Sequence, residues 1–137
     1  MAQNITYGIA DMMKEGNAEI ETLSVDAAKG LVGREDVLIV DLRDPRELER
    51  DGTLPGIFHC PRGMLEFWID PKSPYAKAQF QQDKKYVFFC GGGMRSALAA
   101  QVAQKMGLKP VAHIEGGFAA WRKGEGPIVP WAPKKHG

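Results

Sequence analysis

The sequence has only two cysteines, Cys60 and Cys90, among its 137 residues, which is too few for a disulfide framework. It also lacks any apolar run approaching the roughly 18 residues that a membrane-spanning helix needs. No basic start followed by a long apolar stretch marks a secretory signal. We therefore expect a cytoplasmic protein whose cysteines are kept reduced.

An excess of charge of either sign is lacking as well. Eighteen basic residues against seventeen acidic ones give a formal net charge of +1. This balance argues against a protein that binds nucleic acid or an acidic membrane through bulk charge. Hydrophobic residues make up 44% of the chain, and at this length they suffice for the core of one domain.

Histidines are few, and their positions do not favour a metal site. His59 and Cys60 are adjacent on an expected strand, so their side chains point to opposite faces and cannot chelate one ion together. His113 stands alone on its expected strand, and His136 lies in the C-terminal tail. We interpret each histidine as structural or solvated, and we predict no metal and no cofactor.

The first 18 residues differ from the rest of the chain. Their apolar residues lie close to helical spacing: Ile5, Ile9, Met12 and Met13. This segment, 1–18, is predicted to be an N-terminal extension, either a short amphipathic helix or a partly ordered arm. Residues 19–137 are predicted to form a single domain.

From residue 19 onward, short apolar runs alternate with helical patterns. Strands are predicted at 20–23, 37–42, 57–60, 86–90 and 111–114. Helices are predicted at 25–31, 45–50, 64–69, 74–82, 95–106 and 118–123, with an irregular tail at 126–137. This alternation predicts an α/β fold, a small sheet with helices on both faces.

In such sheets, functional sites form where strands end and loops lead into helices. Cys90 ends a buried strand and is followed by a loop and helix start with the residues Gly91, Gly92, Gly93, Met94, Arg95 and Ser96. Three glycines can turn the chain tightly and aim N–H groups into one concavity, and the helix N-terminus adds the positive end of its dipole. Such a cradle binds an anion and favours the thiolate form of Cys90.

Two further side chains fit this interpretation. Arg95 adds a fixed positive charge with fork-shaped donors, and Ser96 can cap the helix or point its hydroxyl into the loop. A lone cysteine at a strand end is more often a core residue, but the glycines, the arginine and the helix start together favour a functional site. The loop fits neither a Walker motif nor the G-x-G-x-x-G dinucleotide motif.

The segment 90–96 resembles the active-site loop of the single-domain rhodanese sulfurtransferases. Three further segments resemble signatures of this family in the same order: LIVDLRDP at 38–45 with Glu47, LPGIFHCPRG at 54–63, and IEGGF at 114–118 with Trp121 and then Gly126-Pro127. The resemblance covers most of 19–130 and leaves 1–18 outside. It implies a rhodanese-like fold, a five-stranded, mainly parallel sheet flanked by helices.

The resemblance also implies sulfane-sulfur transfer. The Cys90 thiolate would attack the outer sulfur of thiosulfate or a similar donor, release sulfite, and hold the sulfur as a persulfide. The sulfur would then pass to cyanide or to a thiol, on a small molecule or on a partner protein. The loop N–H groups would stabilise the anionic persulfide, as an oxyanion hole does for oxygen.

Each of four side chains outside the loop has two alternative interpretations. Asp41 and Arg43 would lie near the loop and could brace it by an ion pair, although a purely structural role is the favoured interpretation. Arg62 either draws an anionic donor to the mouth of the site or is a solvated surface charge. Cys60 is interpreted as a buried small hydrophobic residue, with a resolving thiol for Cys90 as the alternative.

Three other functions fit parts of the pattern. A phosphatase or arsenate reductase of the related fold has five residues between its cysteine and arginine, whereas four separate Cys90 from Arg95. A non-catalytic rhodanese-like interaction module typically lacks the cysteine that this chain keeps. A redox sensor using Cys60 and Cys90 is the third. The shorter loop and the retained cysteine favour a sulfurtransferase.

Overall fold

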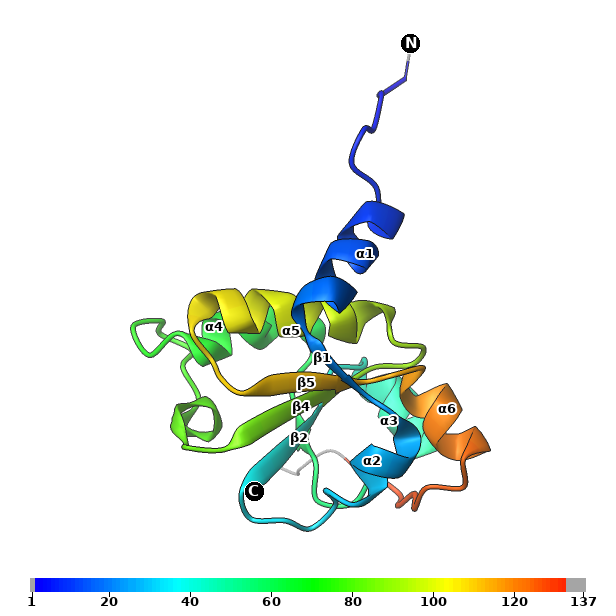
Figure 1. Ribbon diagram of the computed structural model, residues 1–137. Coiled ribbons are helices and arrows are strands. Elements are labelled where there is room, and N and C mark those ends of the chain that lie inside the picture. Colours follow the sequence, from blue (N-terminus) through cyan, green and yellow to red (C-terminus); the bar gives the residue numbers. More distant parts are fainter. Residues whose placement is uncertain (1, 133–137) are drawn as a thin grey trace.

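A parallel sheet lies at the centre of the computed structural model, which describes residues 2–132 (Figure 1). Its strands are β1 (Glu21–Leu23), β2 (Val37–Asp41), β3 (Phe58–His59), β4 (Lys85–Phe89) and β5 (Val111–Ile114). They lie in the order β1-β5-β4-β2-β3, and each neighbouring pair is parallel. The expected mainly parallel sheet is thus parallel throughout its five described strands.

Helices cover both faces of the sheet, as the alternating pattern predicts (Figure 1). One face carries α1 (Ile9–Glu19), the short η1 (Arg62–Met64), α4 (Leu65–Ile69), η2 (Ala78–Gln81) and α5 (Met94–Met106). The other face carries α2 (Val25–Lys29), α3 (Pro45–Asp51) and α6 (Gly117–Lys123). No helix of the described chain is long and apolar enough to cross a membrane.

The strand β4 builds a core on both faces because it is a central strand. Tyr86 and Phe88 join the core under α4 and α5, whereas Val87 and Phe89 join the core on the other face. All four side chains are buried. Alternation along β4 therefore directs Cys90, the next residue on the Tyr86 and Phe88 side, toward α5.

The helix starts predicted at Ser24 and Asp44 are present. The Ser24 side chain accepts from the Ala27 N–H, and the Asp44 side chain accepts from the Arg46 N–H. Glu47 completes a capping box at α3 by accepting from the Asp44 N–H at 2.8 Å. This local bonding fixes where α3 begins. Since α3 follows β2, it starts at the carboxyl end of the sheet, where the Cys90 loop also lies.

The helix predicted at 74–82 is wrong for most of its length. Within that range the structure has only the 3-10 turn η2 (Ala78–Gln81), which buries Phe80. Just before it, the side chains of Asp70 and Ser73 accept hydrogen bonds from backbone N–H groups two residues further on. Such bonds stabilise turns and compete with helix formation.

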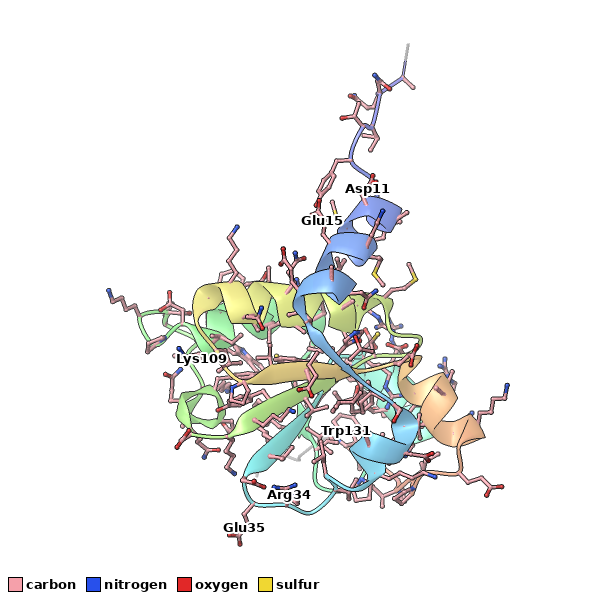
Figure 2. All side chains as sticks on the ribbon, in the orientation of Figure 1. Asp11, Glu15, Arg34, Glu35, Lys109 and Trp131 are labelled. Atoms are coloured by element: carbon pink, nitrogen blue, oxygen red, sulfur yellow. The ribbon has the colours of Figure 1, made fainter. Side chains whose placement is uncertain are left out.

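The N-terminal segment contains a helix, α1, which packs on α5. Gly16 lies at the crossing, where a Cβ atom would come 3.3 Å from the carbonyl oxygen of Ala97. The Gln101 side chain donates to the Glu19 carboxylate at 2.9 Å. Figure 2 shows Asp11 on the part of α1 that extends beyond the sheet. The end of α1 nearest the sheet is therefore the part that reaches the site described below.

Candidate active site

Cys90 lies directly after β4 at the carboxyl end of this central strand, and only 1% of its surface is exposed. Gly91, Gly92 and Gly93 carry the chain from there into α5. Gly93 is the N-cap of α5 and has a φ of 99°, in the left-handed region that glycine adopts without strain. The glycine run thus makes the tight turn that the sequence predicts.

Two backbone N–H groups donate to the Cys90 sulfur. The Gly93 nitrogen lies 3.2 Å from Sγ, and the Ser96 nitrogen lies 3.4 Å from it. Both groups belong to the start of α5, where the positive end of the helix dipole lies. The Ser96 hydroxyl oxygen is 3.7 Å from Sγ. This arrangement stabilises negative charge on the sulfur.

The carbonyl groups of Cys90 and Gly91 accept hydrogen bonds from the N-terminus of α6. The Phe118 N–H donates to the Cys90 carbonyl at 2.8 Å, and the Ala119 N–H donates to the Gly91 carbonyl at 3.0 Å. Gly117 makes this approach possible, because a Cβ atom there would lie 2.4 Å from the Cys90 carbonyl oxygen. These two bonds hold the start of the loop against α6, and the N–H groups of Gly93 and Ser96 face the sulfur.

Arg95 is paired with a carboxylate that the sequence did not single out for the site. Its guanidinium donates to both oxygens of Glu47, at 2.9 and 3.0 Å. This bonding lowers the pKa of Glu47 and raises the pKa of Arg95. A Cβ atom on Gly91 would lie 3.2 Å from the guanidinium, so Arg95 does border the loop. Its charge, however, is shared with Glu47.

Asp41 and Arg43 form a buried ion pair, with 2.8 Å between Nη2 and Oδ2. The Thr53 hydroxyl also donates to Asp41 at 2.8 Å. The Arg43 guanidinium stacks on the Phe118 ring, 4.1 Å from its centroid. Because the Phe118 N–H holds the Cys90 carbonyl, the ion pair contacts the loop through α6 rather than directly.

Arg62 and Cys60 contribute less to the loop. Arg62 pairs with Glu66 at 2.8 Å, and both side chains are partly exposed, which favours the surface-charge interpretation. Cys60 is fully buried in the core on the α5 face, and burial raises its pKa to about 12. Both cysteines are free thiols. Cys60 therefore packs as a small hydrophobic residue.

The two histidines in the described part of the chain, His59 and His113, have different hydrogen-bond partners. His59 donates from Nε2 to the Arg43 carbonyl at 2.7 Å, and its ring packs edge-on against Trp131. His113 is buried, and its Nδ1 lies 3.0 Å from the Ser96 hydroxyl oxygen. His136 lies outside the described residues. Among residues 2–132, no cluster of three or more potential ligands could hold a metal ion.

Three residues of this site are not evident as site residues from the sequence: Glu47, Gly117 and His113. Glu47 and Gly117 were recognised only within segments that resemble family signatures. His113 lies opposite Phe88 in the β4–β5 register. Phe88 is two residues before Cys90, so the His113 side chain lies on the same side of the sheet as these two and faces α5. Finding His113 from the sequence requires the register between β4 and β5, which their apolar patterns alone do not specify.

Residues 24–124 match the Rhodanese-like domain family, which is more than half of the chain. The chain belongs to the rhodanese family. A sulfurtransferase from Allochromatium vinosum is 30% identical over 81% of this chain and 94% of its own length. Helix α1 lies outside the residues that match the family.

Solved structures agree with this rhodanese fold. A protein of unknown function from Rhodopseudomonas palustris, described as a possible tyrosine phosphatase, is 66% identical to this chain with a TM-score of 0.92. The match covers 94% of this chain and 99% of that one. A rhodanese-related protein from Thermoplasma volcanium is 25% identical with a TM-score of 0.64, over 80% of this chain and 97% of that one.

Proposed function

We propose that this rhodanese-family protein is a sulfurtransferase in which Cys90 carries sulfane sulfur from a thiosulfate-like donor to a thiol or cyanide. The observation that carries the proposal is the pair of N–H groups, from Gly93 and Ser96, that donate to the Cys90 sulfur. These N–H groups can stabilise anionic sulfur on Cys90 during the reaction.

The reaction has two steps of nucleophilic displacement. In the first, the Cys90 thiolate attacks the outer sulfur of thiosulfate. A new S–S bond forms, the S–S bond of the donor breaks, and sulfite leaves with the electron pair. In the second, an acceptor thiolate or cyanide attacks the terminal sulfur of the persulfide, and Cys90 leaves as a thiolate. No oxidant or reductant is consumed.

The source of positive potential for an anionic donor differs from the sequence-based expectation. Arg95 is neutralised by Glu47 through two hydrogen bonds, and Arg62 is paired with Glu66. The donors that are aimed at the sulfur are backbone N–H groups at the start of α5. We assign recognition of the anion mainly to these N–H groups and to the dipole of α5.

Phosphoester hydrolysis is a second candidate, because the Rhodopseudomonas palustris relative is described as a possible tyrosine phosphatase. Two observations argue against it here. Only four residues separate Cys90 from Arg95, and a phosphoryl group with three peripheral oxygens needs a wider ring of donors. In addition, the Arg95 guanidinium is already bonded to Glu47. Sulfur transfer therefore fits the loop better.

Intact mass spectrometry tests the proposal directly. After incubation with thiosulfate, the wild-type protein should gain one sulfur atom, and a thiol reductant or cyanide should remove it. Cys90→Ser should gain none while keeping the wild-type circular dichroism spectrum. Hydrolysis of an aryl phosphate is measured on the same samples. Phosphate release without sulfur uptake by the wild-type protein would replace sulfur transfer with the second candidate.

Partners and compartment belong to the same proposal. A free thiol at Cys90 and a free thiol at Cys60 suit a reducing compartment, and we propose the cytoplasm. Sulfur donors and acceptors of the proposed reaction include small molecules and sulfur-carrying proteins. When Cys90 is loaded with isotopically labelled sulfur from the donor, transfer of the label to a low-molecular-weight thiol or to protein thiols distinguishes these acceptors.

A further inference from the structure

A chain of hydrogen bonds runs from the buried Cys90 to the N-terminal helix α1. The Cys90 sulfur lies 3.7 Å from the Ser96 hydroxyl oxygen, which lies 3.0 Å from His113 Nδ1. On the far side of the imidazole ring, Nε2 lies 3.1 Å from Asn17 Oδ1 and 3.2 Å from Thr22 Oγ1. Side chains from three elements, α5, α1 and β1, thus converge on the His113 ring.

The donor and acceptor groups around His113 decide which atom donates in each of these hydrogen bonds. The amide oxygen of Asn17 can only accept, so His113 carries its hydrogen on Nε2 and leaves Nδ1 as an acceptor. The Ser96 hydroxyl then donates to Nδ1, which is closer than its other neighbour, the Gly93 carbonyl at 3.3 Å. A lone pair of the same hydroxyl faces the Cys90 thiol.

The surroundings of His113 keep the ring neutral before reaction. Its residue is 3% exposed, and burial lowers its pKa. The groups that contact it are uncharged: Asn17 from α1, Thr22 from β1 and Ser96 from α5. The carboxylate of Glu115, at the end of β5, acts in the opposite direction and raises the pKa. A neutral ring whose Nδ1 accepts from the Ser96 hydroxyl is able to take up a proton at that nitrogen.

We propose that His113 accepts the proton of Cys90 through Ser96, and that Asn17 and Thr22 are positioning residues that hold the ring in the Nε2–H form. This inference rests on the proposed sulfur transfer, for which it generates the nucleophile. The Cys90 S–H proton passes to the Ser96 oxygen as the Ser96 proton passes to Nδ1. A thiolate and an imidazolium result, with no change in total charge. The same path returns the proton when Cys90 is released.

A cavity of about 360 Å³ lies beside this series of hydrogen bonds, between α1 and the Cys90 loop. Its lining includes Asn17, Thr22, His113 and Gly93. The Nε2 side of the ring therefore borders an open space, while the Nδ1 side faces buried groups. Since α1 lies outside the residues that match the family, Asn17 is a contribution of this chain's own N-terminal segment.

The pH dependence of Cys90 alkylation by neutral iodoacetamide tests the relay, with the labelled site located by peptide mass spectrometry. His113→Asn keeps an amide that can bond Ser96 but cannot take a proton, so the midpoint of the alkylation profile should move up by about one pH unit. Asn17→Asp places a carboxylate on the Nε2–H and should move the midpoint down by about half a unit. Asn4→Asp adds the same charge at an exposed position and should leave it unchanged.

Unmoved midpoints in folded His113→Asn and Asn17→Asp would overturn the relay. So would a parallel shift in Asn4→Asp, because it would show that a general charge effect is responsible. Nitrogen NMR of the wild-type imidazole provides a test without substitution: the Nε2–H tautomer is expected, and a hydrogen on Nδ1 would contradict the relay. Alkylation requires no sulfur donor, so failure of the relay is distinct from failure of sulfur uptake.

Discussion

Arg95 and Glu47 form a two-point ion pair across 48 positions of the sequence, with Nη1 and Nη2 of the guanidinium each donating to one carboxylate oxygen. The pair joins the first turn of α5, beside the Cys90 loop, to the first turn of α3. It replaces the free cation that the loop sequence suggested with a nearly neutral unit. The consequences of this neutrality are measurable.

Replacing Arg95 alone should leave the Glu47 carboxylate uncompensated at the edge of the loop. In Arg95→Ala, the rate of sulfur uptake from anionic thiosulfate should fall about tenfold, because the carboxylate repels the donor. Alkylation by neutral iodoacetamide should change much less. The double variant Arg95→Ala with Glu47→Gln should recover most of the thiosulfate rate. Equal losses for both reagents would show that Arg95 only shapes the loop.

The same pair predicts how stability depends on pH. Hydrogen bonding from Arg95 lowers the pKa of Glu47 in the folded protein. The contribution of the pair to the free energy of unfolding is therefore full above the unfolded-state range near pH 4.3 and is lost as pH falls through the lower folded-state pKa. The magnitude should be below about 1 kcal/mol, since the pair is partly exposed.

Urea unfolding of wild type and Glu47→Gln at several pH values measures this contribution. The wild type should be the more stable at pH 7, and the difference should shrink below pH 4. Gln at this position retains the acceptor of the α3 capping box. The control, Glu35→Gln, changes an exposed residue far from the site (Figure 2) and should show no pH-dependent difference. A constant difference for Glu47→Gln would exclude the ion pair as its source.

Gly117→Ala should disturb the Cys90 loop where its carbonyl groups contact α6. The added methyl group would lie 2.4 Å from the Cys90 carbonyl oxygen, and the φ of 59° is unfavourable for alanine. We expect the free energy of unfolding to fall by about 2 to 4 kcal/mol and sulfur uptake to slow in the folded fraction. Gly33→Ala is the matched control: its φ is 83° but nothing lies within 4 Å of the new methyl group.

The control should lose about 1 kcal/mol for the left-handed backbone alone and keep the wild-type rate of sulfur uptake. Chemical denaturation and intact mass measure the two quantities on each variant. Similar losses of stability and rate in both variants would mean that the close approach between α6 and the loop has no special importance.

Cys60 should be dispensable for chemistry. Burial raises its pKa to about 12, so the thiol stays protonated and unreactive at neutral pH. Cys60→Ala should lower the free energy of unfolding by about 1 to 2 kcal/mol, because it leaves a small cavity, and should not alter sulfur uptake. Peptide mapping after alkylation should find label on Cys90 only. A Cys60–Cys90 disulfide after mild oxidation would instead support the redox-sensor alternative.

The sequence predicts the parts of this protein that depend on neighbouring residues. The apolar run at 86–90 and the three glycines after it predicted a buried strand, a tight turn and a helix start, and all three are present. The caps at Ser24 and Asp44 were equally local. The helix predicted at 74–82 failed because side chains just before it bond the backbone in turns.

Features that depend on how distant elements meet could not be predicted in this way. The partner of Arg95 is 48 positions away, and its identity follows from the packing of α5 beside α3. The contact of His113 with Ser96 depends on the register between β4 and β5 and on where α5 begins. For the same reason, a charged residue in a motif is easier to find than the counter-ion that limits its charge.

The position of β1 has a consequence for how the protein folds. In the sheet, β1 pairs with β5 alone, and across that pair Thr22 meets His113 from 91 positions away. Closing so long a segment costs chain entropy before any contact can repay it, and contacts of this kind slow folding. The glycine loop can form locally, but the environment of its thiol is complete only after one of the longest-range contacts has formed. The reactivity of Cys90 during refolding should therefore report on docking of the N-terminal edge of the sheet.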